Sequence, residues 1–197
     1  MRQGEDLILR DYILSAASQI NAGGGTNGDN PTNLGTSDFS LVAATLDTNN
    51  AFKFLSGIEG QNKFGTAPVR SAYFMLSSTE LQSDFDGLVG SGFINQWNYP
   101  NNSSALLSEY GSIFNIRVLT SSEAPVARTF SAGGRDVYYN FVMGKQAVTH
   151  ISQDGYSMRI IYRDPYYSGM LAQNATLAVK FAQAQAITQD TAIRNLA

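Results

Sequence analysis

The chain has 197 residues, of which 43% are apolar and only 15% are charged, and its formal net charge is −3. This length can bury a core as one domain or two small lobes, but the acidic balance argues against direct DNA binding, which needs a surplus of Lys and Arg. The absence of Cys excludes disulfides, thiolate metal sites and a Cys nucleophile.

The remaining surface must be largely neutral and polar. Such a surface costs less to desolvate than a charged one, which suits a protein covered by neighbouring subunits. No run of about 18 apolar residues is present, so no membrane span or membrane partner is expected.

The chain begins with a predicted amphipathic helix over residues 5–21. Its apolar positions recur at helical spacing on one face: Leu9, Ile13, Ala16, Ala17 and Ile20. Gly23 to Gly25 are predicted to end the helix, and a loop is expected to continue to Thr36. Residues 23–28 superficially resemble a phosphate-binding loop, but a helix precedes them where such loops require a strand.

A second helix is expected from Ser37 to about Asn49, with Ser37 as its N-cap. Its predicted buried face consists of Phe39, Val42, Ala43 and Leu46. A buried strand, residues 71–76, should follow and run straight into a short helix, because Ser77 to Glu80 match a capping box.

Residues 89–108 contain no charged side chain, and we expect them to form a long surface loop. Three aromatic residues within it, Phe93, Trp97 and Tyr99, are the candidate contact with another subunit, since interface anchors are enriched in Trp and Tyr. Two alternatives are packing within the chain's own core and the stacking of a sugar on Trp97 and Tyr99.

The last third of the chain is predicted to be rich in strands. Strands are expected over 111–121, 137–143 and 156–162, the last of them half-buried, with a short helix over 144–150 between them. Leu177, Val179 and Phe181 then alternate with Ala178, Lys180 and Ala182, and the alternation continues weakly to Ile187. A long strand is the first interpretation of this segment, and an alanine-rich helix over 175–186 is the alternative.

No catalytic residue, cofactor site or metal site is predicted. His150 is the only His, and no Gly-x-Ser-x-Gly motif accompanies it. A small hydrolase that uses His150 therefore stays only as an alternative to a structural role.

The order of these segments resembles that of tailed-bacteriophage and prophage major capsid proteins of the Hong Kong 97 type, and most closely the coat proteins of some podoviruses. The segments that carry the resemblance are Ile20 to Leu34, Ala72 to Leu81, Asn115 to Leu119 with Ala124-Pro125, Val137 to Ala147, Arg163 to Pro165 and Leu177 to Phe181. Each motif is weak alone, and their order and spacing carry the likeness.

The resemblance implies an α+β fold. Residues 1–33 would form the spine helix and connector of a peripheral domain, 34–164 an axial domain with a central sheet and flanking helices, and 165–197 the return strands of the peripheral domain. The family has an N-terminal arm and an extended loop ahead of the spine helix, so the likeness covers its C-terminal two-thirds.

The implied function is that of a structural subunit of an icosahedral shell, in the virion and, during assembly, in the host cytoplasm. The implied partners are copies of the chain in hexamers and pentamers, together with scaffolding and portal proteins. No sequence-specific nucleic-acid partner is expected, and the isolated chain is expected to be a monomer or weak oligomer. An encapsulin-type compartment shell is the alternative within this fold.

Overall fold

The computed structural model describes residues 2–22, 32–54, 71–99, 105–106, 108–127, 136–152, 159–165, 175–180 and 182–197. The chain divides into two compact units: unit 1 is Met1–Ala147 with Ile187–Ala197, and unit 2 is Val148–Ala186. Unit 2 is thus an excursion from unit 1, to which the chain returns for its last residues.

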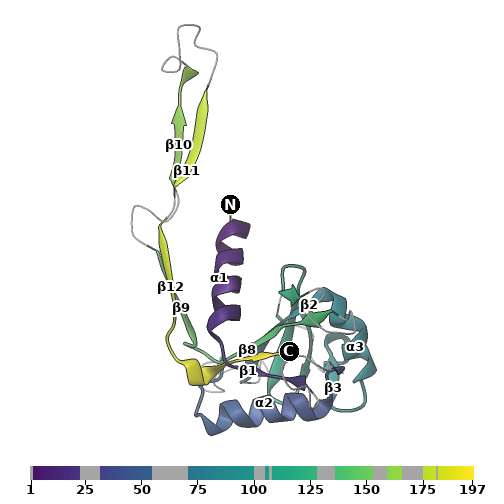
Figure 1. Cartoon of the computed structure of the whole chain (residues 1–197). Helices are drawn as coiled ribbons and strands as arrows, with labels where there is room; N and C mark the ends of the chain where they lie inside the picture. Colours follow the sequence, from purple (N-terminus) through teal and green to yellow (C-terminus); the bar gives the residue numbers. More distant parts are fainter. Residues whose placement is uncertain are drawn as a thin grey trace, which may run out of the picture. The chain divides into compact units, whose positions relative to one another are not determined.

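Unit 1 is built on a mixed seven-stranded sheet (Figure 1). Its strands, in spatial order, are β1 (Gln19–Ile20), β13 (Ile193–Leu196), β8 (Asn140–Met143), β2 (Tyr73–Ser78), β5 (Ile116–Ser121), β4 (Glu109–Ile113) and β3 (Phe93–Asn95). Two neighbouring pairs, β1–β13 and β2–β5, are parallel, and the other pairs are antiparallel. A mixed sheet with separate helices confirms the predicted α+β class.

Helix α2 (Thr36–Thr48) matches its predicted buried face. Phe39, Val42, Ala43 and Leu46 are all buried, as the helical spacing indicated. The N-cap is Gly35 rather than Ser37, because the backbone N–H of Gly35 donates to Asp38 Oδ2 at 2.8 Å. Figure 1 shows α2 along the lower side of the unit, and α2 contacts β13 of the sheet.

The first helix is shorter than its apolar pattern predicts. Helix α1 (Arg2–Ala16) stops well before the glycines, and the backbone then enters β1 beside β13. The N–H of Asn195 donates to the carbonyl of Ser18 at 2.9 Å. Ile20 therefore belongs to a strand, while the predicted glycine cap and connecting loop at 23–31 lie outside the described residues.

The predicted strand-to-helix passage is confirmed. Strand β2 ends at Ser78, whose hydroxyl accepts from the Glu80 N–H at 3.2 Å and caps the 3₁₀ turn η2 (Thr79–Leu81). Helix α3 (Gln82–Gly87) follows at once and buries Phe85. The cap is the second serine of the motif, Ser78, rather than Ser77.

The expected single strand over 111–121 is wrong, since the segment belongs to the hairpin β4–β5. The chain reverses at Phe114, which has a positive φ of 49°. The expected loop over 89–108 is wrong in part, because β3 and the turn η3 (Gln96–Asn98) lie within it. The expected strand over 137–143 is confirmed as β7 (Val137–Tyr138) and β8, and β7 pairs with β6 (Val126–Ala127).

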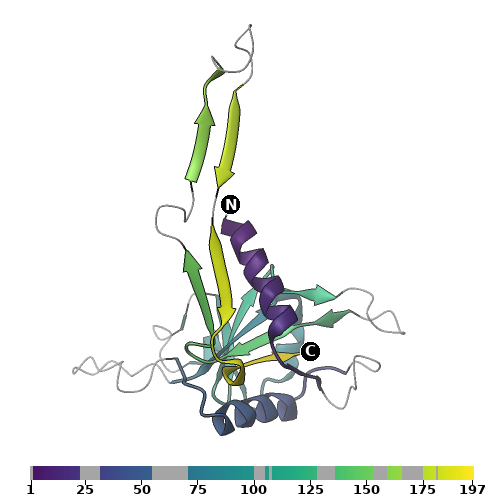
Figure 2. The same ribbon diagram turned by 60° about the vertical axis from the view of Figure 1, so that its left-hand side comes forward.

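Unit 2 consists of two successive antiparallel two-stranded ladders (Figure 2). One joins β9 (Val148–Ser152) to β12 (Gln183–Ile187), and the other joins β10 (Arg159–Arg163) to β11 (Thr176–Lys180). The helix expected over 144–150 and the alternative helix over 175–186 are therefore wrong. The expectation that 156–162 is half-buried is also wrong for its described part, since all of β10 is exposed.

The strands of 165–197 are shared between the two units. Strands β11 and β12 belong to the ladders just described, whereas β13 pairs with β1 and β8 inside the sheet of unit 1. The short turn η6 (Asp190–Ala192) precedes β13. The division into axial domain and return strands at residue 165 stays a prediction, and the contacts within the chain divide it elsewhere.

One glycine in the sheet is required by packing rather than by backbone conformation. A Cβ on Gly111 would lie 2.5 Å from the Phe93 ring and 2.6 Å from the Ile94 carbonyl oxygen. Both contacts lie across the β3–β4 pairing, beside the β-bulge of β4. Any larger residue at 111 must displace β3.

We predict that Gly111→Ala lowers the free energy of unfolding by about 1–3 kcal/mol, the usual cost of overpacking. Gly87→Ala is the matched control, because no atom lies within 4 Å of a Cβ placed there. It should leave stability unchanged or raise it by up to about 1 kcal/mol. Urea unfolding followed by circular dichroism measures both, and equal stabilities of the two variants would contradict the packing argument.

Candidate functional site

The structure separates the three aromatic residues that the sequence grouped as a subunit contact. Trp97, on η3, is 75% exposed, whereas Phe93, on β3, is only 2% exposed. Tyr99 is half-buried just after η3. Of the three, only Trp97 is therefore fully exposed.

Phe93 belongs to an aromatic cluster in the core of unit 1. Its ring centroid lies 5.7 Å from that of Phe85 and 6.1 Å from that of Tyr110. Phe39 joins the same cluster through Phe85 at 6.3 Å. The alternative of core packing within the chain thus holds for Phe93, which cannot reach another subunit without leaving this cluster.

The turn that carries Trp97 is held by local hydrogen bonds. The side chain of Asn95 accepts from the Trp97 N–H at 3.3 Å, and the Tyr99 N–H donates to the Gln96 carbonyl at 3.2 Å. The indole itself remains outside the core. Trp97 and Ile94 are both exposed apolar side chains of this segment, and exposed apolar side chains that come together mark interaction sites.

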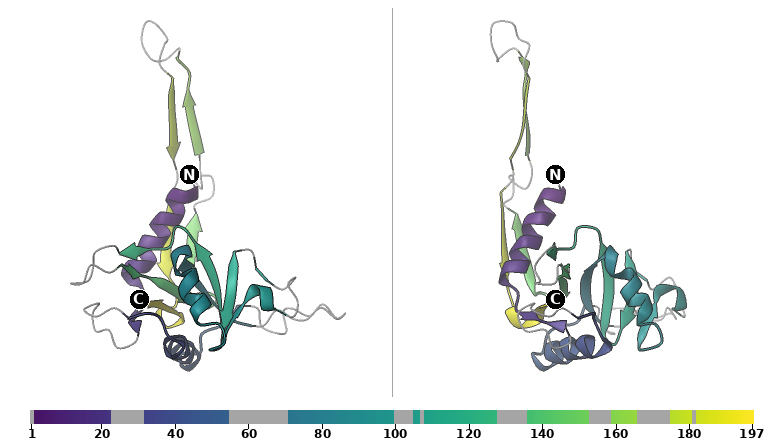
Figure 3. Two further views of the ribbon diagram at one scale, coloured as in Figure 1. Left: turned by 90° about the vertical axis from the view of Figure 1, so that its right-hand side faces the viewer. Right: turned by 45° about the vertical axis from the view of Figure 1, so that its right-hand side comes forward.

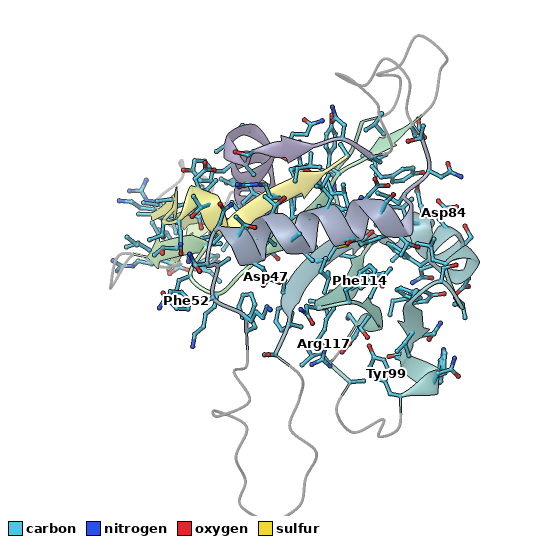
Figure 4. All side chains as sticks on the ribbon, turned by 90° about the horizontal axis from the view of Figure 1, so that it is seen from below. Asp47, Phe52, Asp84, Tyr99, Phe114 and Arg117 are labelled. Carbon is cyan, nitrogen blue, oxygen red and sulfur yellow. The ribbon has the colours of Figure 1, made fainter. Side chains whose placement is uncertain are left out.

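Beneath this turn lies a buried carboxylate, which sequence reasoning missed. Glu109 Oε1 accepts from the Tyr99 hydroxyl and from Arg117 Nε, each at 2.8 Å. Glu109 Oε2 accepts from the Leu106 N–H at 2.8 Å and also bonds the Arg117 guanidinium. Figure 4 shows the side chains of Tyr99 and Arg117 turned toward each other on neighbouring segments. Their spacing in the sequence carries no signal of this arrangement.

The surroundings of Tyr99 change the pKa of its hydroxyl. Burial raises the pKa of the Tyr99 hydroxyl to about 12, and its hydrogen bond to the carboxylate of Glu109 adds to the increase. Tyr99 is therefore protonated and able to donate throughout the neutral range. The Tyr99 hydroxyl also keeps its proton at pH values around the ordinary tyrosine pKa of about 10, where a free tyrosine would begin to lose it.

A second candidate surface is the β10–β11 ladder, which the sequence predicted as strands but not as exposed strands. Ile160 pairs with Val179, and Tyr162 pairs with Leu177. Residues directly opposite in an antiparallel pair project to the same side, so these four side chains form one face. All four are exposed, and we call this set the apolar ladder face.

The opposite face of the same ladder is cationic. Arg159, Arg163 and Lys180 alternate with the apolar set and are the only Lys and Arg residues of unit 2. Ile161 lies among them, paired with Ala178. Figure 3 shows β10 and β11 as a narrow ladder, and no third strand of the described chain pairs with either.

The described residues offer little support for a catalytic His, a metal site or a membrane span. His150 lies exposed on β9, and its Nε2 is 3.2 Å from the side-chain oxygen of Gln183. Among the described residues, no three His, Asp or Glu side chains come together as a metal site would require. In the same residues, no helix is long and apolar enough to cross a membrane.

Comparison with solved structures finds chains from phages. The capsid of Ralstonia phage GP4 matches over 92% of this chain and 52% of its own, with a TM-score of 0.54 and 12% identical residues. A structure from Mycobacterium phage Che8 matches over 98% and 57%, with a TM-score of 0.49 and 12% identity. The capsid of cyanophage P-SCSP1u matches over 90% and 51%, with a TM-score of 0.46 and 12% identity.

The likeness to the GP4 capsid shows that the chain has the fold of a phage capsid protein, as its sequence resemblance implied. The chain spans about half the length of the solved chains it matches. No protein-family model matches the sequence. No curated protein matches it either.

We predict that Arg117→Met lowers the free energy of unfolding by about 3–5 kcal/mol, because it leaves the buried Glu109 carboxylate without its cation. Lys53→Met is the control, since Lys53 pairs with the partly exposed Asp47 at 2.8 Å. Such a pair contributes only about 0–1 kcal/mol. Urea unfolding measures both variants, and similar losses in the two would mean that the burial of the Arg117 pair has no special weight.

Proposed function

We propose that this chain, which has the fold of a phage capsid protein, is a structural subunit of an icosahedral phage shell. The observation that carries the proposal is the match to the GP4 capsid along nearly the whole chain. The fold would then be of the Hong Kong 97 type, with residues 34–164 as the axial domain and with 1–33 and 165–197 as parts of the peripheral domain. The location would be the virion capsid, reached from the host cytoplasm.

The proposed function acts through surfaces rather than through catalysis. Copies of the chain would meet around rotation axes in hexamers and pentamers, which requires a heterologous contact repeated by rotation. Trp97 and the apolar ladder face are the two surfaces proposed for such contacts, since both expose large apolar side chains. Scaffolding and portal proteins are the further partners in this proposal.

The apolar ladder face supports a second copy as its partner. An isolated two-stranded hairpin is marginally stable in water, so a face of four exposed apolar side chains calls for a covering surface. The cationic groups all project to the other side, and a neighbour can therefore cover the apolar face without desolvating them.

The proposed function is tested by expressing the complete reading frame that carries this chain and imaging the product by electron microscopy. Closed shells are expected, with the seven-stranded sheet repeated in every subunit. A product that stays monomeric at all concentrations, with and without its neighbouring genes, would overturn the proposal.

We predict that Trp97→Ala reduces the yield of assembled particles, since the truncation of an interface anchor often costs about 2 kcal/mol or more per contact. The unassembled protein should keep its stability within about 0.5 kcal/mol, because the side chain is exposed. Asn98→Ala, on the same turn, is the control and should assemble normally. Wild-type particle yield from Trp97→Ala would remove this residue from the contact.

The ladder offers a closely matched pair of variants. Ile160 lies on the apolar face and is 60% exposed, while Ile161 lies on the cationic face and is 45% exposed. Ile160→Asp should block assembly, because it places an unpaired charge in the contact, whereas Ile161→Asp should assemble close to normally. Sedimentation of the expressed particles measures the difference. Equal behaviour of the two would mean that the apolar ladder face is not a subunit contact.

A further inference from the structure

Unit 1 buries one ion pair at the edge of its sheet. Glu109, on β4, is 2% exposed and Arg117, on β5, is 5% exposed, whereas the Arg10–Asp11 and Lys53–Asp47 pairs have partly exposed members. This ion pair need not make unit 1 more stable than a pair of apolar residues would. Replacing a buried ion pair with apolar residues of similar size is often neutral or stabilising, because desolvation offsets the attraction.

The geometry of the pair indicates another role. One carboxylate accepts hydrogen bonds from three separate parts of the chain: the Tyr99 hydroxyl, the Leu106 N–H and the Arg117 guanidinium. Tyr99 lies before residues 100–104 and Leu106 lies after them, so Glu109 fixes the chain on both sides of that interval relative to β4. Arg117, from the neighbouring strand, holds the carboxylate itself.

Hydrogen bonds can fix the position of a chain segment more narrowly than an apolar contact can. A hydrogen bond fixes both a distance and an angle, whereas apolar packing at this sheet edge would allow Tyr99 and Leu106 several positions. Trp97 lies two residues before Tyr99, and the Tyr99 N–H bonds the Gln96 carbonyl at the start of the same turn. The position of Tyr99 therefore sets the position of the turn that carries the exposed indole.

We infer that Glu109 and Arg117 are positioning residues for the Trp97 contact, and that their buried ion pair sets the shape of this surface rather than the stability of unit 1. The inference rests on the proposed shell function for its consequence in assembly. Its structural part, the fixing of Trp97, applies to the unassembled protein as well.

The experiment compares Tyr99→Phe and the double variant Glu109→Leu with Arg117→Met against the wild type. Trp97 is the only Trp of the chain, so its fluorescence anisotropy and its quenching by acrylamide report this turn alone. Fluorescence and urea unfolding are measured on the 197-residue chain, and particle yield is measured on the same variants made in the complete reading frame.

The double variant should unfold at a urea concentration equal to or above that of the wild type, yet show lower Trp97 anisotropy. Its assembled fraction should fall about tenfold, equivalent to roughly 1.4 kcal/mol in the overall assembly equilibrium. Tyr99→Phe, which removes a single hydroxyl, should shift anisotropy and assembly in the same direction by a smaller factor. Asn98→Ala should leave all three measurements unchanged.

Wild-type Trp97 anisotropy in both Tyr99→Phe and the double variant would overturn the inference. A loss of stability in the double variant that accounts for its loss of assembly would also overturn it, because the pair would then be structural only. If the double variant does not fold, Tyr99→Phe alone decides. If the wild type does not form shells, the shell proposal fails, while the anisotropy of the unassembled proteins still decides whether Glu109 positions Trp97.

Discussion

The pairing of β13 with β1 and β8 is the constraint on which unit 1 depends. This strand comes from the last residues of the chain, yet it lies inside the sheet, between a strand from residues 19–20 and one from residues 140–143. The exit and return of unit 2 are fixed at the same place, where the Gly144 N–H donates to the Ala192 carbonyl at 2.8 Å and the Thr188 N–H donates to the Ala147 carbonyl at 2.9 Å. The sheet is therefore complete only when the excursion of unit 2 has closed, and the entropy of closing that loop opposes folding until β13 pairs.

Some of this arrangement could be predicted from local patterns. The buried face of α2 follows from helical spacing, and the passage from β2 to α3 follows from the Ser77 to Glu80 motif, although Ser78 makes the cap. Both are set by residues close in sequence. The resemblance to capsid proteins rests on the order of such segments, and the fold confirms it.

The wrong predictions share a physical reason, since tertiary partners decided them. Ile20 continues the apolar face of α1, but the pairing with β13 takes its backbone into a strand. The β4–β5 hairpin turns at Phe114 and Asn115 without a glycine, and a single Asn between two apolar runs is a weak turn signal. Alternation in β10 and β11 correctly separates two faces, but period alone cannot show whether a partner within the chain covers either of them. Glu109 likewise looks like any solvated acid until Tyr99, Leu106 and Arg117 converge on it.

The low charge of the chain has a specific distribution at the two candidate surfaces. Residues 87–108, which carry Trp97, contain no Lys, Arg, Asp or Glu, and the nearest charge on the strand that follows, Glu109, is buried and neutralised beneath the turn. On the ladder, every Lys and Arg of unit 2 projects away from the apolar face. A charge at a contact must be desolvated or paired when a neighbour covers it, at a cost of several kcal/mol when the pairing is poor. Both candidate surfaces thus lack exposed charge, but for different reasons. At Trp97 the nearby carboxylate is buried, and on the ladder the alternation of side chains places the charges on the opposite face. In the proposed shell, this shared absence of charge would lower the desolvation cost of covering both surfaces.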